Sequence, residues 1–160
     1  MYPTKIDLPV AKREAIVKNL NQNLATLIDL RLQAKQAHWN VKGPHFIALH
    51  ELFDKVVSLA DEYVDEVAER LVSLGGVADG TLLPVSKATQ LAAYPTTISE
   101  GPAHVAALAG AIAGATKSAR AGIDYATEHG DAVTADVYTE VARGLDQQLW
   151  FVEAHLQAAK

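Results

Sequence analysis

The chain has 160 residues, no cysteine, 49% hydrophobic residues and a formal net charge of −5. This length suits one domain, residues 1–160, with a substantial core, and the lack of cysteine excludes disulfides and thiolate metal sites. The acidic balance argues against a general nucleic-acid-binding surface, which needs a basic patch, and suits the capture of cations. No secretory signal and no apolar run of about 20 residues is visible, so we expect a cytoplasmic protein.

Residues 1–10 are expected to form a short irregular arm, because Pro3 and Pro9 limit helix formation. A first helix is predicted from about Val10 to Val41. Its apolar residues recur at the spacing of one helix face. They are Ile16, Val17, Leu20, Leu24, Leu27 and Ile28.

A break at Gly43 and Pro44 predicts the end of the first helix and the start of a second, with the proline at the first helical position. This second helix is expected to run from about His45 to Leu74 and to stop at the following glycine pair. Residues 75–100 are rich in glycine and proline and predict a long connection, with a short helix near 86–92. Such a crossover fits a ferritin-like bundle better than an up-down bundle, whose loops are short.

A third helix is predicted from Gly101 or Pro102 to Glu128, with Ser99 as a candidate cap. Gly130 should end it, and a fourth helix is expected over residues 131–158, capped by its first residue, an aspartate. The sequence therefore predicts an all-α, ferritin-like four-helix bundle whose crossover carries a short helix between the second and third long helices.

Two histidines and two carboxylates stand out in this pattern. His38 and His50 flank the break between the first two helices, and Asp65 and Glu69 lie one turn apart on the second. Imidazoles and carboxylates together suit a borderline or hard divalent metal such as iron, zinc or manganese. A hairpin brings the histidines together, but fifteen residues of one helix separate His50 from Asp65, roughly 22 Å. One unbroken helix therefore cannot present all four side chains to the same ion.

A second copy of the chain removes this conflict. If two such helices pack about a two-fold axis near Val57 and Ser58, His50 of one chain lies level with Asp65 and Glu69 of the other. Two equivalent sites then form, because a two-fold interface is self-complementary. The sequence thus predicts metal sites at a homodimer interface.

Two motifs cover this region. The pattern H-W-x-x-x-G-x-x-F-x-x-x-H begins at His38 and ends at His50, and D-x-x-x-E-R spans residues 65–70. Together they resemble the Dps family, the small dodecameric ferritins, and the resemblance extends from about residue 15 to the C-terminus. It implies a ferroxidase centre shared between two subunits of a twelve-subunit cage. Its ligands would be His38, His50, Asp65 and Glu69, with Asp54 as an additional ligand or neighbour.

Several side chains near the histidines are open to more than one interpretation. Asp54 lies one turn after His50 and is either a ligand or a solvated carboxylate. Lys35, one turn before His38, is placed to hydrogen-bond across the site. Trp39 either shields the site, donating from its indole nitrogen, or packs at an interface.

The remaining candidates carry less chemistry. Arg70 is expected to pair with a nearby acid and not to touch metal. Four further histidines have no partner at ligand spacing and are assigned to surface or packing. They are His45, His104, His129 and His155.

A second acidic set, Asp131, Asp136 and Glu140, lies near the start of the fourth helix. In the Dps resemblance this region lines a pore on the three-fold axes, so three copies of these acids would draw iron(II) into the cavity. The alternative is that they stabilise the helix dipole.

Three functions follow for testing. The first is an iron-storing ferroxidase that oxidises iron(II) with hydrogen peroxide or oxygen, with zinc as a competitor for the same ligands. The second is a DNA-compacting protein with a secondary metal site. Few basic residues lie near either end, so we expect DNA binding to be weak or absent. The third is a helical assembly with structural zinc, which the joint motifs disfavour.

Overall fold

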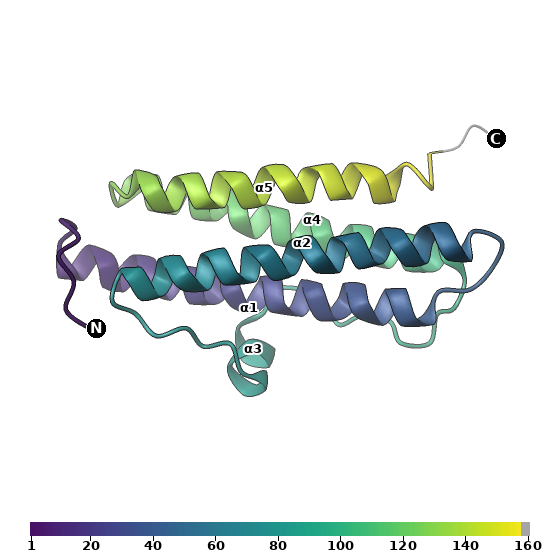
Figure 1. Cartoon of the computed structure of the whole chain (residues 1–160), viewed down its shortest axis with the longest axis horizontal. Coiled ribbons are helices and arrows are strands. Elements are labelled where there is room, and N and C mark those ends of the chain that lie inside the picture. Colours follow the sequence, from purple (N-terminus) through teal and green to yellow (C-terminus); the bar gives the residue numbers. More distant parts are fainter. Residues whose placement is uncertain (158–160) are drawn as a thin grey trace.

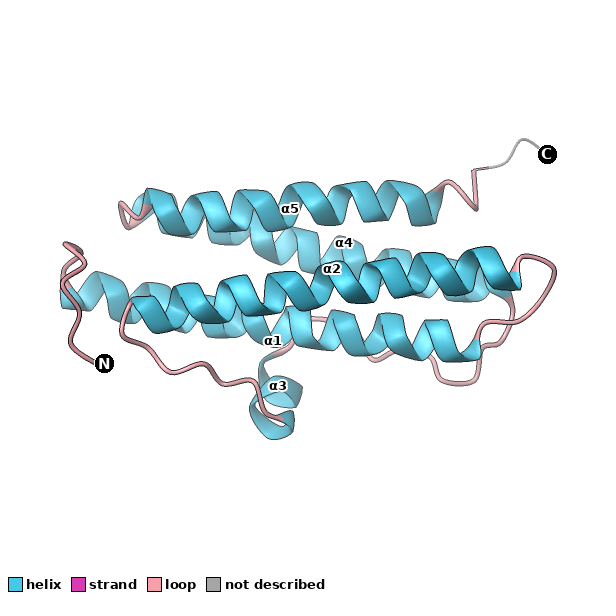
Figure 2. Ribbon diagram, in the orientation of Figure 1, coloured by secondary structure: helices cyan, strands magenta, loops and turns pink. Residues whose placement is uncertain are grey.

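The computed structural model describes residues 1–157, which form helices and loops without a strand (Figures 1 and 2). This all-α architecture confirms the predicted fold. No helix in this range is both long and apolar enough to cross a membrane. The helices are α1 (Val10–Asn40), α2 (Phe46–Ser73), α3 (Leu82–Ala88), α4 (Gly101–Glu128) and α5 (Ala132–Glu153).

The four long helices pack as two antiparallel hairpins, α1 with α2 and α4 with α5. Contacts of α1 with α4 and of α2 with α5 close the bundle. The crossover from α2 to α4 passes along the outside of α1, and α3 lies on this crossover, outside the four-helix bundle and in contact with α1 (Figure 1). This is the crossover with a short helix that the sequence predicts.

The core fills the space between the hairpins. The predicted apolar stripe of α1 faces it: Ile16, Leu20, Leu24 and Leu27 are buried, whereas Val17 and Ile28 are half-buried and pack at its edge. The other long helices add large, fully buried side chains, because each presents apolar residues at the helical period. These include Phe53, Leu71, Leu108, Ile112, Tyr138 and Leu145.

Some predicted helix ends are wrong. Pro44 is not the first helical residue: α2 begins at Phe46, whose N–H donates to the Gly43 carbonyl at 3.0 Å in a turn that precedes the helix. Gly43 has φ +113°, which permits the sharp reversal. Ser99 does not cap α4. Glu100 precedes that helix and makes no side-chain cap, while the Ser99 carbonyl accepts from Lys42 N–H at 2.8 Å.

The short helix lies four residues earlier than predicted, at Leu82–Ala88 and not near residues 86–92. Pro84 is tolerated because it falls in the first turn. The later residues are held by α1: Thr89 donates to Asp29 at 2.7 Å, and Gln33 donates to the Ala92 carbonyl at 3.0 Å. The fourth long helix, α5, ends at Glu153, which is earlier than the predicted end near residue 158: residues 154–156 form turns, and residue 158 itself lies outside the described residues.

A buried ion pair joins α2 to the turn between α4 and α5. Asp131 caps α5 as predicted, accepting from Thr134 N–H at 3.0 Å. Arg70 donates to both carboxylate oxygens of Asp131 at 2.9 Å and to Thr134 Oγ1 at 2.9 Å. Burial raises the pKa of Asp131, but hydrogen bonds from Thr134 and Arg70 lower it more, so the pKa lies below its ordinary value.

We expect Asp131→Asn to lower the free energy of unfolding at pH 7 by about 3 kcal/mol, because it leaves the half-buried Arg70 without a counter-charge. The depressed pKa makes this stabilisation fully present above the unfolded value of about 3.9, and it is lost as the pH falls through the folded value. The difference in the free energy of unfolding between wild type and variant should therefore narrow at low pH. Guanidinium unfolding at a series of pH values from 7 to 2 measures this difference.

The matched control is Asp146→Asn, which breaks the exposed pair of Asp146 with Arg120. Its expected cost is below about 1 kcal/mol, because solvent screens this pair. An Asp131→Asn variant that loses no more than this control would contradict the assignment of a buried structural pair.

Candidate metal centre

His38 and His50 hold each other in a reciprocal clasp. His38 Nδ1 lies 2.8 Å from the His50 carbonyl oxygen, and His50 Nδ1 lies 2.9 Å from the His38 carbonyl oxygen. The rings stack with centroids 3.7 Å apart and an interplanar angle of 23°. Because a carbonyl only accepts, each Nδ1 carries a proton and each Nε2 of the neutral ring keeps a lone pair. The clasp therefore fixes the tautomer in which both Nε2 atoms can bind metal.

The clasp depends on how α1 ends. Val41 N–H donates to the Ala37 carbonyl at 3.0 Å, but Lys42 N–H turns away to the Ser99 carbonyl. Continuing the ladder would have taken Lys42 to His38. The His38 carbonyl is thus one of the orphan acceptors of a helix end, and the His50 side chain satisfies it. Phe46 packs on the His50 ring, with centroids 5.1 Å apart.

Asp54 and Lys35 lie beside the clasp. Lys35 Nζ donates to Asp54 Oδ1 at 2.5 Å, and this oxygen is 3.9 Å from His38 Nδ1. The hydrogen bond from Lys35 lowers the pKa of Asp54, against a smaller opposing effect of burial. The predicted hydrogen bond of Lys35 across the site is therefore present. Lys35 also balances the Asp54 charge, which makes Asp54 a less available ligand than a free carboxylate.

Asp65 and Glu69 lie far from the histidines of the same chain. The helix that carries them, α2, runs unbroken over 28 residues, so the separation of roughly 22 Å from His50 holds. Both carboxylates are exposed, and neither is in an ion pair within residues 1–157. Within the same range, no group of three or more His, Asp or Glu side chains could hold a metal ion. One chain thus presents two separate halves of the predicted ligand set.

Several large apolar side chains of α1 and α3 are exposed. Trp39 is 67% exposed at the end of α1, and Leu32, two turns earlier, is 48% exposed. The adjoining α3 adds Leu82 and Leu83, 76% and 69% exposed. Sequence reasoning missed these two leucines, although an adjacent leucine pair inside a polar connection is a signal of an interaction surface.

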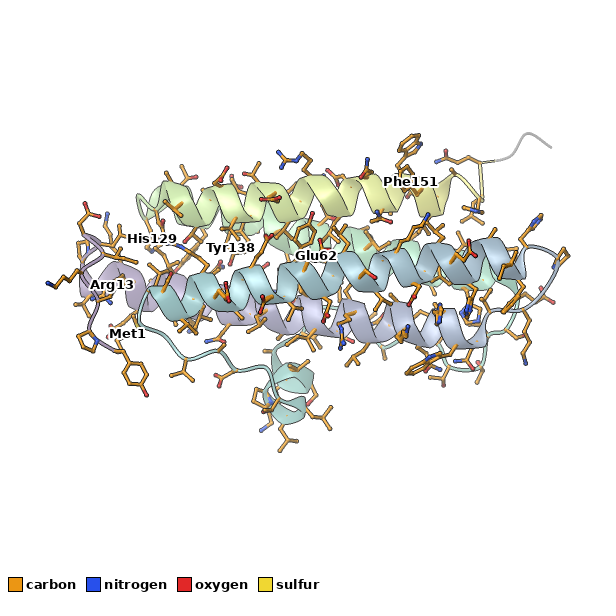
Figure 3. The ribbon with its side chains drawn as sticks, in the orientation of Figure 1. Met1, Arg13, Glu62, His129, Tyr138 and Phe151 are labelled. Carbon is orange, nitrogen blue, oxygen red and sulfur yellow. The ribbon has the colours of Figure 1, made fainter. Side chains whose placement is uncertain are left out.

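Acidic side chains accumulate between α2 and α5. Burial raises the pKa of Glu66, and the neighbouring charges of Glu140, Glu62 and Asp65 raise it further. Tyr63 is affected in the same way, with a pKa raised by burial and then by Glu140. Figure 3 shows Glu62 near the middle of α2. Carboxylates that destabilise one another in this way make a surface that attracts cations.

The predicted pore acids do not form one set. Asp131 is only 3% exposed and is paired with Arg70 and Thr134. It therefore does not offer a free carboxylate to a pore. Asp131 is thus the nearby acid with which Arg70 was expected to pair. Asp136 and Glu140 are exposed on α5, and their pore role stays a prediction.

The model of the ferritin-like domain family matches residues 17–160 of this chain. The DNA protection during starvation protein of Agrobacterium fabrum is 47% identical over 156 residues, which cover 98% of this chain and 96% of the relative. The Mycolicibacterium smegmatis protein of the same name is 37% identical and covers 92% of this chain and 80% of the relative.

Solved structures agree with this similarity. Dps of Mycobacterium smegmatis in a tetragonal form has a TM-score of 0.92 and 35% identity, covering 98% of this chain and 95% of that one. DpsA14 of Streptomyces coelicolor has a TM-score of 0.93 and 36% identity, covering 99% and 93%. With the ferritin-like bundle and the match over almost its whole length, the chain belongs to the Dps family of ferritin-like proteins.

Proposed function

We propose that this chain is an iron-storing ferroxidase. Iron(II) binds between His38 and His50 of one chain and Asp65 and Glu69 of a second, hydrogen peroxide or oxygen oxidises it, and iron(III) oxide collects inside a hollow cage of twelve subunits. The observation that carries this proposal is the clasp, in which both Nδ1 protons are bound to carbonyls and both Nε2 lone pairs are available. A packing role for two histidines would not require this shared tautomer.

Three features support completion of the site by a second chain. The length of α2 separates the histidines from the carboxylates, and a two-fold axis near Val57 and Ser58 would bring the two halves together. Asp65 and Glu69 are exposed and unpaired within the described chain. The exposed apolar side chains of α1 and α3 are of the kind that another copy of the chain would cover.

The ligand set suits iron(II) as a substrate. Two neutral imidazoles and two carboxylates balance the charge of a divalent ion and leave coordination positions for an oxidant. Peroxide needs two electrons, and each iron(II) supplies one. Oxidising two iron(II) ions reduces one peroxide to two hydroxides, without the one-electron cleavage that releases a hydroxyl radical. Zinc would bind the same ligands without turnover and so compete.

DNA compaction is the alternative, and the name of the relatives keeps it open. Two observations disfavour it here. The net charge is −5, and the N-terminal arm is held on the bundle: Tyr2 N–H donates to Gly75 O at 2.7 Å, and Arg13 donates to Leu8 O at 3.1 Å and Leu74 O at 2.8 Å. Figure 3 shows Met1 and Arg13 together at one end of the bundle. Removal of iron and peroxide would then be the route to DNA protection.

We expect the double variant Asp65→Ala/Glu69→Ala to oxidise iron(II) at least about 100-fold more slowly than wild type, because half of the ligand set is gone. Iron(II) is loaded anaerobically, peroxide is added, and the rise of iron(III) absorbance is followed. A sizing column checks that the assembly is intact. Equal rates in an intact assembly would refute the site and leave a cage that only nucleates mineral.

The pore hypothesis is tested by the double variant Asp136→Ala/Glu140→Ala. Like Asp65→Ala/Glu69→Ala, it removes two carboxylates that lie four residues apart on one helix. We expect iron(II) oxidation to slow severalfold at low iron(II) and to recover at saturating iron(II), because entry and not the centre is impaired. The iron(II) concentration at half-maximal rate is the measurement. A lowered maximal rate with unchanged half-saturation would contradict a pore role.

For the alternative function, we expect no gel retardation of linear double-stranded DNA at about 150 mM salt. Any binding seen at 50 mM should collapse as salt rises, since few lysines or arginines are available for phosphate contacts. Clear retardation at 150 mM would overturn the preference for a ferroxidase that does not compact DNA.

A further inference from the structure

Three carboxylates lie on one face of α2 at intervals of one helical turn. They are Asp61, Asp65 and Glu69, and residues four apart on a helix are neighbours. Only the last two are proposed ligands, although Asp61 lies just roughly 6 Å along the helix from Asp65. Asp61 and Asp65 also line the same surface hollow, together with Ser58 and Glu62. The spacing alone thus does not decide which carboxylates of this face bind metal.

An arginine of α1 pairs with Asp61 and with neither of the other two acids. Arg31 Nε lies 2.6 Å from Asp61 Oδ1. This Nε is buried and meets no acceptor at full hydrogen-bond geometry, so the contact is an ion pair held by charge. The two side chains are 42% and 59% exposed, and a pair this exposed adds little to stability. Its main effect is to neutralise one acid of this face of α2.

The bases of α1 that reach α2 end at Arg31. Lys35 and Arg31, four residues apart on α1, each pair with an aspartate of α2. Three residues before Arg31 the same face of α1 continues with Ile28, which is apolar and lies against the crossover. The acids further along α2, Asp65 and Glu69, form no ion pair within residues 1–157. The position of the last base of α1 thus separates the paired acids from the available ones.

We propose that Arg31 is a specificity-determining residue of the proposed iron centre. By pairing with Asp61, it withholds this carboxylate from the metal, so that the chain contributes only Asp65 and Glu69. The inference rests on the proposed function, because it needs these two residues to bind metal. A free Asp61 would add a negative charge one turn from Asp65, and the two carboxylates would supply oxygen ligands to a further divalent ion.

The test counts the cobalt(II) ions bound per chain of the assembled protein, by equilibrium dialysis and metal analysis. We expect Arg31→Met to bind about one more cobalt(II) ion per chain than wild type, because Asp61 and Asp65 are then both free to hold it. Arg31→Lys keeps the positive charge and should keep the wild-type count. The thermal unfolding midpoint of Arg31→Met should change little, since the pair is exposed.

The double variant Arg31→Met/Asp61→Asn isolates the cause. It removes the freed carboxylate together with the arginine, so the cobalt(II) count should return to the wild-type value. Arg120→Met is the matched control, because it also frees an aspartate, Asp146, from an exposed ion pair. It should bind no further cobalt(II) at concentrations that saturate wild type.

Three results would overturn the inference: an unchanged count in assembled Arg31→Met, an equal rise in Arg120→Met, or a rise that persists in the double variant. If Arg31→Met does not assemble, Arg31→Gln replaces it with the same expected rise. A double variant that binds less cobalt(II) than wild type also overturns the inference, because Asp61 is then itself a ligand.

The variant Asp65→Ala/Glu69→Ala distinguishes failure of the inference from failure of the proposed function. Wild-type cobalt(II) binding in this variant refutes the proposed centre, and the role of Arg31 with it. Loss of binding there, without a rise in Arg31→Met, refutes only the role of Arg31.

Discussion

The continuity of α2 is the constraint on which the proposed chemistry depends. This helix runs from Phe46 to Ser73 without a break, so it carries one proposed ligand near its start and two near its end. A rigid rod of this length cannot fold back to join them. A kink at its centre would allow a site within one chain, but the helix contains neither proline nor glycine. The straightness of one helix thus decides how many chains a working centre needs.

Both ends of this helix are held by polar side chains and not by packing alone. At its start, His50 satisfies the orphan carbonyl of His38. At its end, Arg70 reaches Asp131 and Thr134 at the turn between α4 and α5. Hydrogen bonds and ion pairs of this kind add less to stability than apolar burial does, but they have strict geometric requirements. They therefore set the rotation of α2, and with it the direction in which Asp65 and Glu69 point.

Periodic patterns in the sequence were enough to predict the bundle and the closeness of His38 and His50, because helix period and a Gly-Pro break are local signals. Asp131 as a cap was also visible locally. The failures have a common cause in contacts distant along the chain. Ser99 gives its carbonyl to Lys42, and Thr89 is held by Asp29, so neither the cap nor the short helix followed its local pattern.

The candidate site shows the same division. The sequence shows the types and spacing of the candidate ligands, but not the tautomer of the two histidines, which depends on carbonyls that only the folded helix end exposes. Asp131 illustrates the opposite error. It carries the charge of a pore acid, and only its burial beside Arg70 shows that this charge is already used. A lone histidine such as His104 looks identical in sequence whether it lies at the surface or in the core.

The proposed division of the ligands between two chains would have a consequence for when the chemistry begins. A newly folded chain already holds its two histidines in the binding tautomer, but alone it offers an ion no carboxylate from Asp65 or Glu69. Iron oxidation would therefore start only once subunits have paired, and an isolated chain would not release ferric ions into solution. By mass action, the metal would in turn favour the paired state. Assembly and iron oxidation would then both depend on the equilibrium between single and paired subunits.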